Sequence, residues 1–269
     1  MKRNELSVIG SLIIALLIVS AIFAPFLAPY DPYEQNLDQG LKGPTYQHVL
    51  GQDKLGRDIL SRIIYGARIS IIVGFTTVII STSLGIVIGS LSGFSGGLAD
   101  EIVMRIIDIF LAFPGILMAI AVMAVRGPGL NNVIIALCLF GWVGYARLVR
   151  AQALAIKERE YILAALALGG STIRVIARHL VPNLIGPVIV QATFGMATAI
   201  LAEAGLSFLG LGTQPPQPSW GSLLNEGRQF LLIAPHLTTF PGLAIMLVTL
   251  GFNFLGDSLR DRFDPKMKD

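Results

Sequence analysis

Three ionisable side chains lie within or beside apolar stretches of the sequence, where a charge needs a partner or a function. Arg105 and Asp108, in MRIIDIF, are three residues apart, so they would share one face of a helix and could pair locally. We expect that pairing to be structural, with a transport role as the alternative. Glu203, in ILAEAGLSFLGLG, has no charged neighbour in the sequence, so it must face a bundle interior, a water-filled cavity or the outer interface. Structural and pathway roles both remain open for Glu203.

Other groups that could perform chemistry do not combine into a site. His48, His179 and His236 are scattered, and Cys138 is the only cysteine, so no spacing resembles a metal site. The glycine-rich pieces SLSGFSGG and LGLG lack the Gly-Lys-Ser/Thr ending and the strand–turn–helix context of a phosphate loop. We therefore expect no catalytic residues, no metal, no cofactor and no nucleic-acid partner for this chain. A membrane-embedded enzyme is disfavoured because titratable residues are not clustered.

The elements that position these residues are long apolar runs. Of the 269 residues 54% are hydrophobic and 14% are charged, and the mean hydropathy is +0.71, outside the usual range of soluble domains. A helix needs about 20 mostly apolar residues to cross a bilayer, and its backbone groups then bond internally. Runs without Asp, Glu, Lys or Arg occur at Leu6–Tyr30, Ile69–Ala99, Ile109–Val125, Gly127–Ala146, Leu180–Ala202 and Gln229–Gly256. These runs lack the alternation of barrel strands, so they predict an all-α integral membrane protein with six transmembrane helices.

The runs also predict how the chain is divided. We expect a short terminus over 1–6, a first transmembrane helix over 7–29 that is retained as an anchor, and a loop over 30–68. The core over 69–258 holds the other five helices, with a loop over 147–183 on the side of the termini, another over 209–236 on the opposite side, and a tail over 259–269. Lysine and arginine are more frequent on the side of the termini, so the positive-inside bias favours a multi-pass protein with both termini in the cytoplasm.

The stretch REYILAALALGGSTIRVIARHLVPNL, residues 159–184, has a helical pattern in the middle of the loop over 147–183. After the Gly169-Gly170 pair, Ser171 can cap a new helix. Apolar residues with helical spacing fall on one face of that helix, while Arg174 and Arg178 lie four apart on another. Pro182 should end the helix, because proline disfavours helical geometry in the residue before it. The pattern predicts helix, glycine turn and helix at a membrane surface.

Two roles are open for such a segment. Its arginines could meet lipid phosphates, or it could dock a cytoplasmic partner and pass movement between that partner and the membrane. The stretch resembles the EAA loop of binding-protein-dependent ABC importers, whose pattern is Glu-Ala-Ala, three residues, Gly, and later a hydrophobic pair ending in proline. Leu163 stands in place of the glutamate, so we expect docking to rely on shape and on the arginines. The resemblance implies an ATPase-coupling site made of Ala164, Ala165, Gly169, Ser171, Arg174, Arg178 and Pro182.

Four more stretches extend the resemblance along almost the whole chain, to the second permease subunit of the dipeptide, oligopeptide and nickel uptake class. They are HVLGQDKLGRDILSRIIYGARIS at 48–70, MRIIDIFLAFPGILMAIAV at 104–122, SFLGLGTQPPQPSWGSLLNEGR at 207–228 and FPGLAIMLVTLGFNFLGDSLRDRFDPK at 240–266. The resemblance implies a type I ABC importer permease in a prokaryotic inner membrane. Its partners would be a homologous permease subunit, two cytoplasmic ATP-binding subunits that hold ATP and Mg, an extracytoplasmic solute-binding protein and membrane lipid.

The expected substrate is a short peptide, with nickel or glutathione as alternatives within the same class. A more distant alternative is an ion-coupled secondary transporter, in which Glu203 or Asp108 would be the ion site. That alternative predicts transport by this chain alone, driven by an ion gradient, whereas a permease subunit transports nothing without its ATPases and its partner permease.

Overall fold

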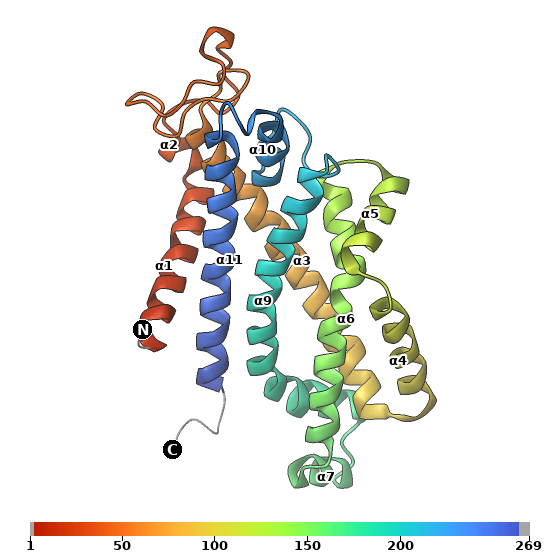
Figure 1. The fold of residues 1–269 in the computed structure, drawn as a ribbon. Coiled ribbons are helices and arrows are strands. Elements are labelled where there is room, and N and C mark those ends of the chain that lie inside the picture. Colours follow the sequence, from red (N-terminus) through yellow and green to blue (C-terminus); the bar gives the residue numbers. More distant parts are fainter. Residues whose placement is uncertain (1–2, 264–269) are drawn as a thin grey trace.

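The computed structural model describes residues 3–263, with side chains from residue 5 onward; residues 1–2 and 264–269, which belong to the predicted terminal segments 1–6 and 259–269, lie outside the described residues. Figure 1 shows a bundle of long helices running between two ends. One end holds the start of α1 (Arg3–Ile22), the end of α11 (His236–Phe263) and α7 (Glu160–Ala167), and we call it the elbow end. The opposite end, which we call the cap end, holds the loop over 28–58 and α10 (Trp220–Gly227).

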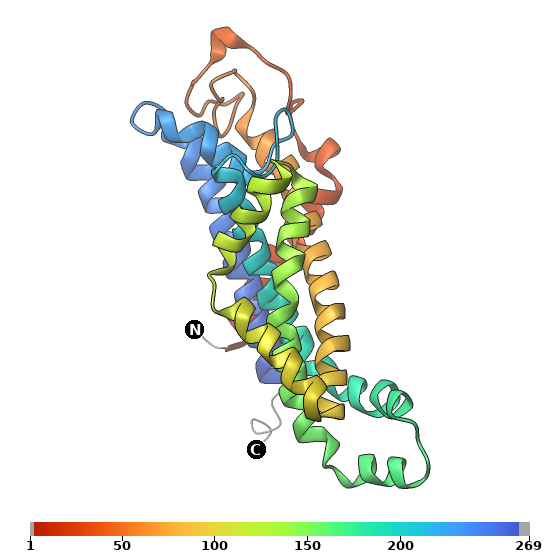
Figure 2. The same cartoon turned by 90° about the vertical axis from the view of Figure 1, so that its right-hand side faces the viewer.

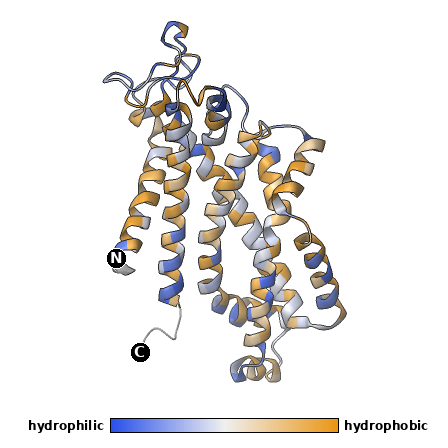
Figure 3. Ribbon diagram, in the orientation of Figure 1, coloured by the Kyte–Doolittle hydropathy of each residue, from blue (hydrophilic) through white to orange (hydrophobic). Residues whose placement is uncertain are grey.

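Long helices form the body of the bundle. Five of them are long and apolar enough to cross a membrane: α1, α3 (Ile59–Ser95), α6 (Leu130–Lys157), α9 (Val181–Phe208) with the helical turns before it, and α11. A sixth crossing is formed if α4 (Gly97–Leu111) and α5 (Gly115–Arg126) together make one span. Hydrophobic residues cover most of these helices, and hydrophilic ones gather toward the two ends (Figure 3). The all-α membrane fold is therefore confirmed.

The third apolar run is not one straight helix. Its residues are divided between α4 and α5, which meet at an angle of 84°. Pro114 is the N-cap residue of α5, with an extended backbone at φ −60° and ψ 122°. Proline donates no backbone hydrogen bond and disfavours helical geometry in the residue before it, so the helix breaks at this position.

Helix α3 is longer than its apolar run predicts. It begins at Ile59 instead of Ile69, because the Asp58 side chain accepts a hydrogen bond from the Ser61 backbone N–H and caps the first turn. Its 37 residues would extend about 55 Å at 1.5 Å per residue, well beyond a hydrocarbon layer of about 30 Å. The first turns of α3 therefore belong to the cap end, where they contact the loop over 28–58.

Glycines bring the backbones of α3 and α6 into close contact. Gly85, Gly89 and Gly93 lie four residues apart on one face of α3. A Cβ atom at Gly85 would lie 2.3 Å from the Tyr145 Cβ, and one at Gly89 would lie 2.4 Å from the Ala146 carbonyl oxygen. Small residues at this spacing let membrane helices pack closely. In lipid the hydrophobic effect does not drive helices together, so dispersion contacts between the two helices stabilise the pair. Helix α3 also packs against α9, so α3, α6 and α9 form the centre of the bundle.

A buried cluster of four charged residues joins the loop at the cap end to α10. Asp53 accepts hydrogen bonds from Arg57 Nε at 2.6 Å and from Arg62 Nη1. Glu226, on α10, accepts from Arg57 Nη2 at 2.7 Å and from Arg62 Nη1 at 2.9 Å. The side chains of Asp53, Arg57 and Arg62 are at most 4% exposed. Two carboxylates balance two guanidinium groups, so the cluster ties the loop, α3 and α10 together without net charge.

Candidate coupling elbow and central cavity

The segment between α6 and α9 folds back on itself as an elbow outside the bundle (Figure 2). It contains α7, a turn at Gly169 and Gly170, and α8 (Thr172–Val175). Gly169 has φ +84°, a conformation that side-chain-bearing residues rarely adopt, and the Gly170 N–H donates to the Ala165 carbonyl oxygen at 3.0 Å. The predicted order of helix, glycine turn and helix is therefore present in the structure.

The end of α8 differs from the sequence expectation. Pro182 does not end the helical path: a π-helical turn, Ile176–Leu180, follows α8 directly, and Pro182 lies in the first turn of α9. Proline donates no backbone hydrogen bond to the preceding turn, and that turn here is the wider π-helical one. Ser171 is the N-cap residue of α8, but its side chain makes no capping hydrogen bond. The elbow is thus joined to α9 by continuous helix.

One face of the elbow packs against the bundle. Ile162 from α7, Val175 from α8 and Leu180 from the π-helical turn are buried in one cluster with Val149 and Ala153 of α6. Burial of this apolar face fixes the elbow to α6 and to the start of α9. A force on the elbow would therefore reach both helices.

The opposite face of the elbow is accessible. Among the residues that the resemblance assigns to coupling, Ala165 is half-buried and the others are exposed: Ala164, Gly169, Ser171, Arg174, Arg178 and Pro182. Large apolar side chains lie between them, with Leu168 89% exposed and Ile173 74% exposed. Leu163, at the position of the family's glutamate, is 53% exposed. The elbow therefore presents an apolar surface bordered by arginines.

The prediction of a local ion pair between Arg105 and Asp108 is wrong. Both side chains are exposed, and the ion pairs found among the described residues do not join them. The carboxylate that is paired in α4 is Asp100, which accepts from Arg150 Nε at 2.5 Å and from Arg150 Nη2 at 2.6 Å. Ser92 also donates to Asp100. This bidentate contact ties α4 to α6 and to the end of α3.

Glu203 is completely buried near the cap end of α9. Its Oε1 accepts a hydrogen bond from Ser207 Oγ at 2.6 Å, and Ser207 Oγ accepts from the Thr213 backbone N–H at 3.1 Å. Its Oε2 has no hydrogen-bond partner within the described part of the chain. The chain of contacts runs from α9 to the loop before α10, so the geometry favours a structural role.

Replacement of Glu203 should separate the two roles left open for this residue. We expect Glu203→Gln to keep solute uptake, because the amide oxygen can still accept from Ser207. Glu203→Leu should leave the Ser207 O–H without its acceptor and lower the free energy of unfolding by about 1–3 kcal/mol. Thermal unfolding of the purified protein and uptake by vesicles would measure both effects. Loss of uptake in the glutamine variant with unchanged stability would support a pathway role instead.

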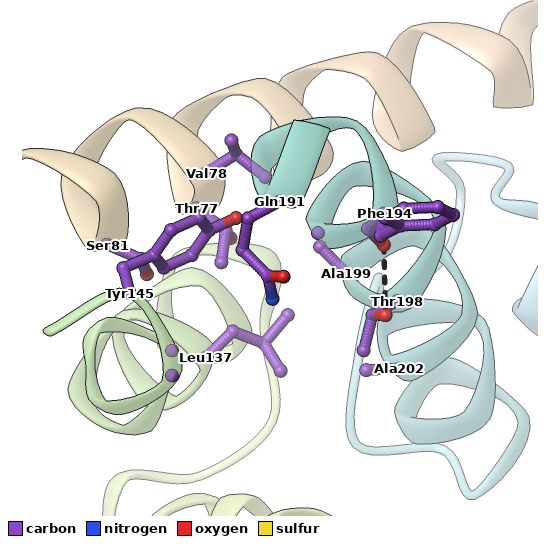
Figure 4. Close-up of a pocket in the computed structure, with 13 residues that line it drawn as sticks. Thr77, Val78, Ser81, Leu137, Tyr145, Gln191, Phe194, Thr198, Ala199 and Ala202 are labelled. Carbon is purple, nitrogen blue, oxygen red and sulfur yellow. Dashed lines mark hydrogen bonds between the residues drawn. The ribbon is translucent and has the colours of Figure 1, made fainter. Parts of the chain in front are cut away.

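A cavity of about 210 Å³ lies between α3, α6 and α9 near the middle of the bundle (Figure 4). Its polar lining residues are Thr77, Ser81, Tyr145, Gln191 and Thr198, and the others are glycines and apolar residues. Ser81 Oγ, Thr77 Oγ1 and Tyr145 OH are buried and have no hydrogen-bond partner within residues 5–263. Glu203 does not line this cavity. Sequence reasoning missed the cavity, although the spacing of Thr77 and Ser81 places both hydroxyls on one helical face.

The described residues contain no cluster of three or more His, Cys, Asp or Glu side chains that could hold a metal ion. The histidines lie apart: His48 contacts Asp58 through Nδ1 at 2.9 Å, while His236 is near the Gln52 carbonyl oxygen.

The chain matches two family descriptions. Residues 85–269 match "Binding-protein-dependent transport system inner membrane component", and residues 1–44 match "N-terminal TM domain of oligopeptide transport permease C". The chain is also similar to the dipeptide transport system permease protein DppC of Alkalihalophilus pseudofirmus. The two are 47% identical over 268 residues, which cover 100% of this chain and 88% of the relative.

A second group of relatives carries a different name. The glutathione transport system permease protein GsiD of Escherichia coli O6:K15:H31 is 46% identical over 268 residues, covering 99% of this chain and 88% of the relative. That of Pectobacterium atrosepticum is 45% identical over 267 residues, covering 99% and 89%. Together with the helical fold, these matches show that the chain is a transport permease subunit and not an enzyme. It belongs to the family of binding-protein-dependent transport system inner membrane components, the permease subunits of ABC importers.

Proposed function

We propose that this chain is a permease subunit that imports short peptides across the inner membrane of a prokaryotic cell. The observation that carries the substrate class is the identity of 47% to a dipeptide permease over the full chain. Both termini would be cytoplasmic, which places the elbow end in the cytoplasm and the cap end outside it. The lysines and arginines between Arg147 and Arg178 support this orientation, because positive charge favours the cytoplasmic side.

The partners follow from the family. The chain would pair with a homologous permease subunit, receive peptide from an extracytoplasmic solute-binding protein, and be driven by two cytoplasmic ATPases that hold ATP and Mg. Lipid would surround the exposed apolar faces of the helices. The elbow would be the ATPase-coupling site, with Ala164, Ala165, Gly169, Ser171, Arg174, Arg178 and Pro182 at or near the contact. Its apolar surface supports this role, because apolar side chains in water favour burial by a protein partner.

The continuous path from elbow to bundle suggests how work is transmitted. Closure of the ATPases would move α7 and α8, and the buried cluster around Ile162 and Leu180 would carry that movement into α6 and α9. Both helices line the central cavity, so their movement would open the pathway to one side of the membrane and close it to the other.

Substitution at Leu168 tests the coupling site without loss of packing, because this side chain is 89% exposed. We expect Leu168→Asp to lower ATP-driven peptide uptake and the retention of ATPase subunits during purification at least about tenfold, equivalent to about 1.4 kcal/mol. Leu232→Asp is the matched control, since Leu232 is 97% exposed at the cap end. Normal ATPase retention in Leu168→Asp would argue against the elbow as the docking site.

Glutathione is the second candidate substrate, favoured by the relatives at 45–46% identity. It is itself a small peptide, so the same pathway could carry it. Uptake of labelled dipeptides and of labelled glutathione would be compared in proteoliposomes that contain the complete transporter, ATP and the binding protein. The cargo that accumulates would identify the substrate. Uptake of glutathione alone would replace the dipeptide assignment, and ion-driven uptake by this chain alone would overturn the permease proposal.

A further inference from the structure

The first membrane helix ends in an exposed aromatic segment. Helix α1 is followed by the short helix α2 (Ala24–Leu27), which lies where α1 reaches the cap end (Figure 1). Phe23 and Phe26 are exposed there, Phe26 to 86%. Because α1 is long and apolar enough to cross a membrane, these side chains continue its lipid-facing surface toward the headgroups of one leaflet.

A pocket of about 350 Å³ opens beside this segment. It is lined by Tyr30, Asp31 and Tyr33 of the loop after α2 and by Tyr65 of α3, together with prolines and an alanine. The rings of Tyr33 and Tyr65 meet edge to face, with 6.4 Å between their centroids. Asp31 and Tyr33 are exposed, so a ligand that enters the pocket can reach both side chains. Tyrosines gather at the level of the headgroups in membrane proteins.

The pocket has an unpaired negative charge in its wall and a positive charge next to it. Asp31 Oδ1 accepts a hydrogen bond from the Tyr33 backbone N–H at 2.8 Å, and its carboxylate forms no ion pair among the described residues. The Arg68 guanidinium carbon lies 5.5 Å from the centre of the Tyr65 ring. Arg68 Nε also donates to the Ala21 carbonyl oxygen at 2.7 Å, which holds the guanidinium at the end of α1.

These groups match the two charges of a zwitterionic phospholipid headgroup. An ammonium group is attracted to a carboxylate and to the faces of tyrosine rings. The phosphate, joined to the ammonium by a short carbon chain, is a good partner for a guanidinium group. The acyl chains would lie along Phe26 and the exposed apolar side chains of α1. A soluble amine has no acyl chains, so it would leave this apolar surface unused.

We propose that this pocket binds the headgroup of a phospholipid that carries an ammonium group, in the leaflet at the cap end. Asp31 and Tyr33 would contact the ammonium, and Arg68 would contact the phosphate. The bound lipid would bridge the end of α1 and the first turns of α3. This inference goes beyond the proposed function and does not depend on peptide cargo, since it needs only the membrane around α1.

Two lipids and two acidic residues provide the test. The complete transporter would be placed in nanodiscs of equal parts phosphatidylethanolamine and phosphatidylglycerol, of which only the first has an ammonium group. Each lipid in turn would carry a photoreactive acyl chain, and mass spectrometry would count its cross-links to residues 23–33. We expect wild type to prefer phosphatidylethanolamine about fivefold, from carboxylate and cation–π attraction. Asp31→Asn should abolish this preference, because the amide keeps an acceptor for the Tyr33 N–H but loses the charge. Asp38→Asn, at an exposed acid of the same loop, should keep it.

An excess of alanine dipeptide provides a second reading, because its amino terminus is also an ammonium group. It should not reduce the cross-links to phosphatidylethanolamine, since it lacks acyl chains. Equal cross-linking of the two lipids in wild type would overturn the headgroup site, and so would a wild-type preference in Asp31→Asn. Displacement of the lipid by the dipeptide would show that the pocket takes peptide amino groups, and would overturn the lipid assignment while leaving peptide import intact.

Discussion

Replacement of Asp53 by alanine is expected to lower the free energy of unfolding by about 3–5 kcal/mol, because it breaks a buried ion cluster from its centre. Asp53 Oδ2 accepts from Arg57 and Arg62, and its Oδ1 accepts from the backbone N–H groups of Leu55 and Arg57 at 2.8 and 3.0 Å. Without this carboxylate, two buried guanidinium groups would share Glu226 alone. One positive charge would then remain uncompensated on guanidinium groups that are at most 4% exposed.

Asp38→Ala is the matched control, since Asp38 is an exposed acid in the same loop. Thermal unfolding of the detergent-purified protein should place the midpoint of Asp53→Ala roughly 10 °C below that of wild type and of the control. Limited proteolysis should also cut the loop over 28–58 earlier in Asp53→Ala. Equal unfolding midpoints for the two variants would mean that the cluster adds little to stability.

The second large effect is expected at Gly85, where α3 and α6 touch. A methyl group there would lie 2.3 Å from the Tyr145 Cβ and 2.9 Å from the Ala146 backbone nitrogen. No side-chain rotation relieves a contact with backbone, so the two helices must move apart. We expect Gly85→Ala to cost about 1–3 kcal/mol by overpacking. Because Tyr145 also lines the central cavity, peptide uptake should fall as well.

Gly205→Ala serves as the control for this substitution, because a Cβ atom at Gly205 would have no neighbour within 4 Å. Alanine favours helix over glycine, so this control should be neutral or slightly stabilising. Unfolding midpoints and uptake of both variants would be compared in the assembled transporter. A Gly85→Ala variant that behaves like Gly205→Ala would show that α3 and α6 can separate freely.

The sequence predicts the helical membrane fold because that fold depends on local composition. A run such as Leu180–Ala202 is long enough and apolar enough to cross a bilayer, whatever surrounds it. The glycine turn of the elbow could be predicted for the same reason, since Gly169 and Gly170 interrupt a helical pattern. The helix–turn–helix order depends on neighbours in the sequence, and the structure has it.

Features that depend on distant partners could not be predicted in this way. Asp53 and Glu226 are far apart in the sequence, and only the docking of α10 brings them to the same arginines. The pairing expected for Asp108 fails for a similar reason, since the partner for a carboxylate of α4 comes from Arg150 on α6 and binds Asp100 instead. The cavity could not be predicted because serine and threonine are common in helices, and its lining residues come from three helices that only the tertiary fold brings together.

The π-helical turn between α8 and α9 sets the rotational phase of α9. Residues of an α-helix advance by about 100° each, and the π-helical turn Ile176–Leu180 joins the elbow to α9 with no loop between them. A single residue inserted before Val181 would turn α9 by about that angle and direct Gln191 away from the cavity. Insertions and deletions should therefore be excluded between residues 176 and 191.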